Sequence, residues 1–169
     1  MLTLCMIVKN EENTLKESLS RASSFVDEII IVDTGSTDNT KDIALEFTDK
    51  IYDFKWCSDF SKARNYSIEK ASNDWILVLD ADEFIVDFSR SSVEKFIENP
   101  SNRNKVGRIK RINFMEDSYV NSKYIERINR LFNRNYFNYE GIIHEQVVAL
   151  DGKPYETEMV DITADHVGY

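Results

Sequence analysis

The chain has 169 residues, of which 42% are hydrophobic and 30% charged, and 30 acidic against 21 basic residues give a formal net charge of −9. This composition is typical of one globular domain with a sizeable core and excludes a disordered or fibrous protein. The acidic charge argues against nonspecific nucleic-acid binding. No apolar run approaches the roughly 20 residues that a transmembrane helix needs, so stable membrane insertion is not expected.

The first residues and the cysteines favour a cytoplasmic protein. The sequence MLTLCMIVKNEEN lacks the basic region and cleavage site of a signal peptide, and it predicts a strand instead. Cys5 and Cys57 lie far apart, without the spacing of metal ligands. Two such cysteines indicate a reducing compartment.

Strand-like and helical segments alternate through the first half of the chain. Apolar runs predict strands at 2–8, 27–36, 50–56 and 75–84. Apolar residues at helical spacing predict helices at 11–25, 37–49 and 59–72, the last with Asp59 as its N-cap. Alternation of this kind predicts βαβ units, and therefore an α/β fold with a mainly parallel central sheet flanked by helices.

Polar residues follow three of these predicted strands. They are Lys9, Asn10 and Glu11 after the first, 33–36 after the second, and Asp80 with Asp82 after the fourth. In parallel α/β sheets the ligand binds beyond the carboxyl ends of the strands. We therefore expect these residues to line one binding rim.

The second half is dominated by strands. A helix is predicted at 91–100, and strands are predicted at 106–114, 126–133, 141–150 and 155–169. No linker or repeat interrupts the chain, so 1–169 is expected to be a single domain. Its excision from a longer chain stays open. Residues 1–85 would form a nucleotide-binding half, and residues 86–169 would form a mixed half. Trp56 and Trp75 are expected in the core.

The segment WILVLDADEF runs from a buried strand into three carboxylates. Side chains of a strand repeat every two residues, so Asp80 and Asp82 are predicted to point to the same side. Two carboxylates on one side can bind a hard divalent cation. The alternative is an ordinary turn at the end of the strand, capped by one of these residues.

Four segments together resemble the family 2 glycosyltransferases of the GT-A fold. These are MIVKNEEN, EIIIVDTGSTDNT, DFSKARNYSIEKASNDWILVLDADE and GIIHEQ. They are most similar to a bacterial branch whose members often carry helical repeats after the catalytic domain. The resemblance covers most of the chain and is strongest over residues 2–85. It implies that residues 86–169 bind the acceptor and complete a metal site.

The resemblance implies a nucleotide-binding set and a DXD motif. Asp33 would hydrogen-bond a uracil-type base, Arg64 would reach the base or diphosphate, Asp80 would lie near the ribose and Asp82 on the metal. The segment that receives base and ribose would be Val8, Lys9, Asn10 and Glu11. Many relatives read VDDGS, but Thr34 stands here in place of the second Asp, which weakens any role that needs two carboxylates there.

The metal implied by the resemblance is Mn²⁺ or Mg²⁺. Its ligands would be Asp82 and His166, with Asp80 beside them, because HVGY resembles the HYGY-type ending of this branch. An imidazole ligand suits manganese somewhat better than magnesium. The alternative is that His166 is an ordinary strand residue.

An inverting transferase also needs a base that takes the proton of the acceptor. The resemblance favours Glu145 in IHEQ, with His144 as the substitute. In a regular strand the two side chains would face opposite sides, so only one would face the site unless the chain bends after Gly141. The alternative for Glu145 is a salt bridge with Arg127, Arg130 or Arg134.

The expected function is metal-dependent, inverting transfer of a sugar from a nucleotide-sugar, most readily a UDP-sugar, to a peptide, protein or glycan acceptor. Homodimer formation stays open. A sugar-nucleotide nucleotidyltransferase would need a Gly-rich, Arg-containing loop after the first strand, and VKNEEN has no glycine. A nucleotide-sugar binding domain with little or no transfer activity remains the alternative.

Overall fold

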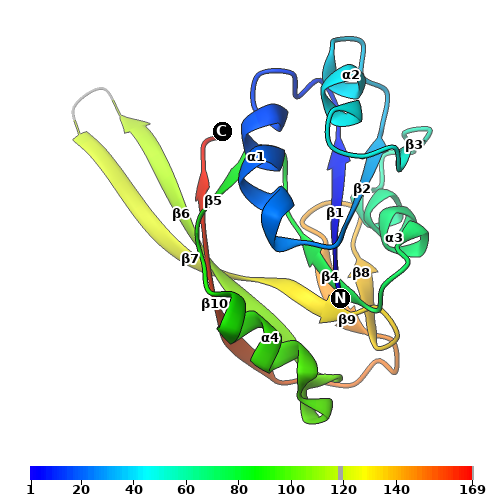
Figure 1. Ribbon diagram of the computed structural model, residues 1–169, viewed down its shortest axis with the longest axis vertical. Coiled ribbons are helices and arrows are strands. Elements are labelled where there is room, and N and C mark those ends of the chain that lie inside the picture. Colours follow the sequence, from blue (N-terminus) through cyan, green and yellow to red (C-terminus); the bar gives the residue numbers. More distant parts are fainter. Residues whose placement is uncertain (118–119, 169) are drawn as a thin grey trace.

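An eight-stranded sheet forms the centre of the computed structural model, which describes residues 1–117 and 120–168 (Figure 1). The strand order is β3-β2-β1-β4-β7-β6-β10-β5, and β8 and β9 form a separate two-stranded sheet. The first four strands are mutually parallel, whereas β7 runs antiparallel to both β4 and β6. The predicted α/β class with a mainly parallel central sheet is confirmed.

The first half contains every predicted element in the predicted order; β1 has the predicted bounds, and the other elements are shorter than predicted. The elements are β1 (Leu2–Val8), α1 (Leu15–Ala22), β2 (Glu28–Asp33), α2 (Thr40–Leu45), β3 (Ile51–Asp53), α3 (Phe60–Lys70) and β4 (Trp75–Val78), with a 3-10 turn at Ser23–Phe25. Asp59 caps α3 as predicted, because its side chain accepts a hydrogen bond from the backbone N–H of Lys62.

The second half contains two strands that the sequence did not predict, β5 and β8. Its elements are β5 (Glu83–Phe88), α4 (Arg90–Glu98), a 3-10 turn (Pro100–Asn102), β6 (Val106–Asp117), β7 (Val120–Asn133), β8 (Phe137–Glu140), β9 (Gln146–Ala149) and β10 (Thr157–His166). The prediction absorbed the start of β5 into the fourth strand, because apolar residues continue on both sides of the turn that separates them.

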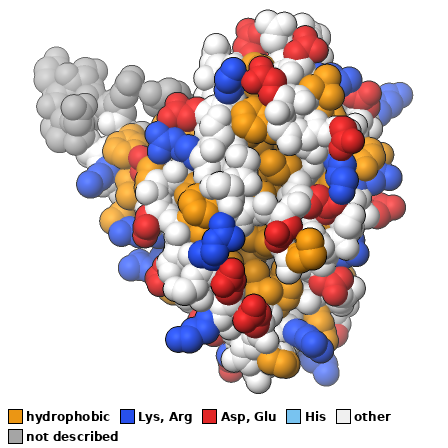
Figure 2. All heavy atoms as spheres, viewed as in Figure 1, with side chains coloured by type: hydrophobic (Ala, Val, Ile, Leu, Met, Phe, Trp, Pro, Cys, Tyr) orange, Lys and Arg blue, Asp and Glu red, His pale blue; other side chains and the backbone are white. Residues whose placement is uncertain are grey.

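The sheet is covered on both faces, as its continuous apolar strands require. One face packs against α1 and α4, with Leu4, Leu19 and Phe96 in the core. The other packs against α3 and the β8–β9 pair, with Ile68 and Phe132 in the core. On the surface, charged side chains of both signs are interspersed over the face seen in Figure 2.

The strands β6 and β7 form a long antiparallel hairpin that extends away from the rest of the domain (Figure 1). Its base joins the sheet where β4 pairs with Leu131, Phe132 and Asn133 of β7. The preceding residues of β7 therefore run beyond the end of β4 and border the site described below.

The prediction of a strand at 141–150 is wrong for residues 141–145. Strand β9 begins only at Gln146. Before it, the backbone turns, with Gly141 and His144 at positive φ values of 113° and 55°. Residues other than glycine rarely adopt this left-handed backbone conformation. It breaks the alternation of side chains that a strand would impose.

Candidate active site

The carboxyl ends of the parallel strands meet at one rim, as the βαβ pattern predicted. Val8 of β1 pairs in register with Asp33 of β2, and Asp33 pairs with Asp53 of β3. The first three strands thus end at the same level, whereas β4 ends at Val78 opposite Cys5, three residues before the end of β1. Both the polar residues after β1 and the turn after β4 lie at this rim.

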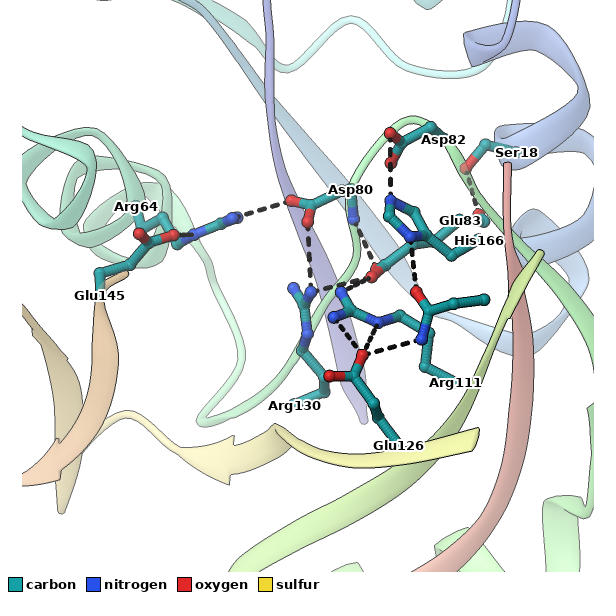
Figure 3. A network of polar contacts seen from close by, with 11 residues as sticks. Ser18, Arg64, Asp80, Asp82, Glu83, Arg111, Glu126, Arg130, Glu145 and His166 are labelled. Carbon is teal, nitrogen blue, oxygen red and sulfur yellow. Dashed lines mark hydrogen bonds and ion pairs between the residues drawn. The ribbon is translucent and has the colours of Figure 1, made fainter. Parts of the chain in front are cut away.

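Asp80 and Asp82 stand in a tight turn rather than on a strand. β4 ends at Val78, and the backbone N–H of Glu83 donates to the carbonyl of Asp80 at 3.0 Å, which closes the turn. The prediction that the two carboxylates share a strand face is therefore wrong. Asp80 is directed to Arg64 and Arg130, and Asp82 to His166 (Figure 3).

Asp80 is held between two guanidinium groups. Its Oδ1 lies 2.8 Å from Arg64 Nη2, and its Oδ2 lies 3.2 Å from Arg130 Nη2. Burial would raise the pKa of Asp80, but the charges of Arg64 and Arg130 outweigh that penalty and hold the pKa well below its usual range. This carboxylate is therefore ionised under all ordinary conditions.

Glu83, the third acid of the segment, supports the site from below. Its side chain is fully buried, and Oε1 accepts hydrogen bonds from Arg111 at 3.0 Å and Arg130 at 2.9 Å. The other oxygen accepts from the backbone N–H of Asp80 at 2.9 Å, and the carbonyl of Glu83 accepts from Ser18. Glu83 thus fixes the turn relative to β6, β7 and α1.

Asp82 and His166 form the second polar contact of the turn, with 3.4 Å between Asp82 Oδ2 and His166 Nε2. The Nδ1 of His166 lies 2.7 Å from Asn113 Oδ1, and Asn113 Nδ2 donates to Glu126 Oε2 at 2.8 Å. A carboxylate only accepts, so the amide of Asn113 must face it with nitrogen and present oxygen to His166. Nδ1 of His166 therefore carries a proton and donates it to Asn113, and Nε2 faces Asp82.

This pair suits a divalent ion. Two adjacent ligands, each about 2.1 Å from a metal, stand about 3 Å apart, close to the separation of Asp82 Oδ2 and His166 Nε2. Fixing a histidine tautomer through its other ring nitrogen is typical of metal sites. Within residues 1–117 and 120–168, no three His, Cys, Asp or Glu side chains are grouped as potential ligands. The described residues thus offer two candidate ligands rather than a complete shell.

The chain passes directly over Asp82 after His166. The backbone N–H of Val167 donates to the carbonyl of Asp82 at 2.9 Å. A Cβ atom on Gly168 would lie 1.6 Å from Asp82 Oδ2. Only glycine allows the backbone to approach this carboxylate so closely, which gives the glycine of HVGY a physical role.

A cleft of about 450 Å³ opens above the turn. It brings together seven predicted site residues: Val8, Lys9, Glu11, Arg64, Asp80, Asp82 and His166. Burial raises the pKa of Glu11, and the charges of Asp82 and Asp80 raise it further. Negative charge is therefore concentrated at this mouth, where a cation would relieve it.

Two predicted nucleotide-binding residues, Asn10 and Asp33, do not line the cleft. Asn10 has a positive φ of 52°, and its side chain accepts a hydrogen bond from the backbone N–H of Thr37 at 2.8 Å. Asp33 is buried, and its Oδ1 accepts from the N–H groups of Gly35 and Ser36. Its Oδ2 is buried without a hydrogen-bond partner among the described residues.

The prediction that Trp56 lies in the core is wrong. Trp75 is buried in the core as expected, but Trp56 is only partly buried and lines the cleft together with Phe60. The two rings meet edge to face, with centroids 4.8 Å apart. They form the aromatic wall of the cleft.

Glu145 and His144 border a second cavity of about 570 Å³, which shares Phe60, Arg64 and Asp80 with the cleft. The bend after Gly141 allows both side chains to line it, which a regular strand would have prevented. Glu145 Oε1 accepts a hydrogen bond from Arg64 Nε at 2.6 Å. Its partner is therefore Arg64 rather than any of the three arginines considered from sequence.

Four residues of this site were not predicted as members: Glu83, Arg111, Asn113 and Arg130. β6 and β7, which hold three of them, were predicted, whereas Glu83 begins the unpredicted β5. Each of the four contacts a partner far away in sequence. The sequence feature that could have indicated them is the set of arginines in the segments at 106–114 and 126–133. Arg130 in particular lies next to buried apolar residues.

The comparison with known proteins decides the family. The sequence profile described as Glycosyl transferase family 2 matches residues 3–150. The chain belongs to family 2 of the glycosyltransferases. The resemblance inferred from the motifs is confirmed.

Two curated relatives are similar over most of the chain. A TPR repeat-containing protein of Synechococcus elongatus is 37% identical over 86% of this chain, and the SPbeta prophage-derived glycosyltransferase SunS of Bacillus subtilis is 31% identical over 99%. The chain spans 35% and 40% of their respective lengths.

Solved structures agree with the GT-A fold. TarS of S. aureus, in complex with UDP-GlcNAc, aligns over 99% of this chain and 59% of its own, with a TM-score of 0.63 and 14% identity. Glucosyl-3-phosphoglycerate synthase of Mycobacterium tuberculosis, bound to phosphoglyceric acid, covers 67% of this chain and 44% of its own, with a TM-score of 0.51 and 19% identity. At these identities the likeness concerns the fold alone. Among the described helices, none is long and apolar enough to cross a bilayer.

Proposed function

We propose that this domain transfers a sugar from a UDP-sugar to an acceptor hydroxyl or thiol, with a divalent metal and with inversion at the anomeric carbon. The observation that carries the proposal is the contact between Asp82 and His166 at the carboxyl ends of the parallel strands, 3.4 Å apart, within a family 2 fold.

The donor would occupy the cleft above the turn. The rim residues Val8, Lys9 and Glu11 would contact base and ribose. The Oδ2 of Asp33 has no hydrogen-bond partner among the described residues and would accept the N–H of the base, which supports the assignment of Asp33. TarS has been solved with UDP-GlcNAc and the mycobacterial synthase with UDP-glucose, which supports a UDP-sugar here.

Asp82 and His166 would hold Mn²⁺ or Mg²⁺, and diphosphate and water would complete the shell. The mycobacterial synthase has been solved with either ion, which supports this choice. Such an ion acts as a Lewis acid on the leaving diphosphate, so no proton donor is needed there. Both oxygens of Asp80 already accept hydrogen bonds from guanidinium groups. Asp80 would therefore lie near the ribose rather than bind the metal.

Glu145 would act as the base. The acceptor oxygen or sulfur forms a bond to the anomeric carbon, the bond from that carbon to the diphosphate breaks, and the acceptor proton passes to Glu145. Arg64 contacts both Glu145 and Asp80, and so it would hold the base beside the donor. His144 remains the substitute. The cytoplasmic location is part of the proposal, and the exposed free thiol of Cys57 supports it.

Calorimetric titration of UDP tests the donor and metal assignments. We expect binding with Mn²⁺ or Mg²⁺, weak or no binding with EDTA, and loss of the metal-dependent part in Asp82→Asn. An exposed control, Asp151→Asn, should bind as the wild type does. Equal binding with metal and with EDTA would exclude the metal assignment.

A second assay separates transfer from simple binding. Hydrolysis of a UDP-sugar and its transfer to an acceptor are measured side by side, and NMR of the product reports the configuration at the anomeric carbon. Metal-dependent UDP binding without hydrolysis or transfer would favour the alternative, a nucleotide-sugar binding domain.

A further inference from the structure

The second cavity is rich in arginine. Five of the nine arginines of the chain line it, although the protein as a whole carries a net charge of −9. They are Arg64, Arg108, Arg111, Arg127 and Arg130. An acidic surface repels anions at long range, so a concentration of guanidinium groups in one cavity is a local reversal of the field.

Three of these arginines are matched by carboxylates and two are not. Arg64 pairs with Asp80 and Glu145, and Arg111 and Arg130 share Glu83, with Glu126 also on Arg111. Across residues 1–117 and 120–168, Arg108 and Arg127 form no ion pair. Arg108 instead donates from Nη2 to the carbonyl of Arg127 at 2.6 Å, which brings its guanidinium against β7.

Buried donors along this cavity lack partners. Arg64 Nη1, Arg108 Nε and the hydroxyl of Tyr139 are buried without a hydrogen bond to any described residue. All three side chains line the cavity, and Arg64 and Tyr139 are only 8% and 5% exposed. A buried donor left unsatisfied costs about 1–3 kcal/mol. Such donors in a cavity indicate a group that accepts hydrogen bonds when bound.

We propose that this cavity binds an anionic group of the acceptor, a phosphate or a carboxylate. A guanidinium offers a planar pair of N–H donors that matches both oxyanions. Arg108 and Arg127 supply the uncompensated charge, and Arg64 and Tyr139 supply further donors. The identification of this ligand as the acceptor rests on the proposed function. The presence of Glu145 in the same wall supports it, because the candidate base must reach the acceptor.

The test uses inorganic phosphate and acetate as separate probes. The domain, saturated with UDP and Mg²⁺ so that the donor cleft is filled, is titrated with each anion while the arginine Nε–H signals are followed by ¹H–¹⁵N NMR. We expect saturable shifts of the Arg108 and Arg127 signals. A response to phosphate alone assigns a phosphate site, and a similar response to acetate assigns a carboxylate site.

A matched pair of variants completes the test. Arg108→Gln with Arg127→Gln should weaken anion binding at least tenfold, whereas Arg90→Gln with Arg103→Gln removes the same charge outside the cavity and should leave it unchanged. Thermal unfolding and UDP binding check the fold. If the double variant does not fold, Arg127→Gln alone, at an exposed position, should also weaken anion binding, by a smaller factor.

No saturable binding of either anion, or equal weakening in both double variants, would overturn the proposal. Failure of the proposed function gives a different result, namely no UDP binding by the wild type. In that case the anion titration, repeated without UDP, still shows whether the cavity binds phosphate or acetate.

Discussion

Asn113 presents its side-chain oxygen to Nδ1 of His166 at 2.7 Å, and thereby turns the other ring nitrogen toward Asp82. Asn113→Ala removes this acceptor, so the ring can rotate or change tautomer. We expect Mn²⁺ affinity to fall about 10–100-fold. The concentration of free Mn²⁺, measured by electron paramagnetic resonance at increasing protein concentration, gives the affinity.

The exposed Asn135→Ala is the matched control and should bind Mn²⁺ like the wild type. Unchanged affinity in Asn113→Ala would mean that this asparagine does not position a metal ligand.

Gly168→Ala should disturb the same site from the other side. The added methyl group would overlap Asp82 Oδ2, so either the carboxylate or the chain after His166 must move. We expect metal-dependent UDP binding to weaken at least tenfold in calorimetry. Gly152→Ala is the control for a general loss of stability, because its φ of 71° strains an alanine while nothing lies within 4 Å of the added Cβ and it is not a residue of the site. Equal UDP binding in both variants would contradict the close approach.

Glu83→Ala should destabilise the fold strongly. It leaves the buried Arg130 and the adjacent Arg111 without their shared carboxylate. Breaking a buried ion pair from one side costs about 3–5 kcal/mol. Urea unfolding measures this loss. Glu126→Ala, whose side chain is 38% exposed, should cost clearly less, and a similar cost for both would argue against Glu83 as the buried support.

The lowered pKa of Glu28 predicts that the protein loses stability in acid. Burial opposes its ionisation, but hydrogen bonds from Lys50, Ser72 and Thr3 lower its pKa from 4.5 to about 2. Its contribution to stability is therefore full above pH 4.5 and is lost as the pH falls through the range from 4.5 to 2.

The free energy of unfolding, measured by urea at several pH values, should fall less steeply over that range in Glu28→Gln than in the wild type. The exposed Glu17→Gln should keep the wild-type slope. Parallel curves for Glu28→Gln and wild type would refute the assignment.

Glu145→Gln separates chemistry from binding. We expect kcat for sugar transfer to fall about 10²–10⁴-fold, because general base catalysis contributes on that scale. UDP affinity should stay within a few fold, since Glu145 lines the second cavity and not the donor cleft. His144→Gln is the companion variant, and a larger loss there would assign the base to His144.

The sequence by itself determined the order of elements in the first half and the rim at which they end. Apolar runs such as 2–8 and 27–32 are local signals, and the rule that ligands bind beyond parallel strands needs no coordinates. It also offered Asp80, Asp82 and His166 as candidate site residues, through the resemblance to the family. It missed β5 and the turn at 141–145, because a tight turn between apolar residues leaves the pattern of a strand nearly unchanged.

Only the tertiary structure decided which charges meet. Arg64 lies between Asp80 and Glu145, 16 and 81 residues away in sequence, and Asn113 reaches His166 because β6 and β10 pair in that register. Composition and periodicity describe neighbours along the chain, but these contacts depend on strand order, register and the bend after Gly141. The motif residues could thus be found from the sequence, whereas the arginines that support them and line the second cavity became apparent only in the folded sheet.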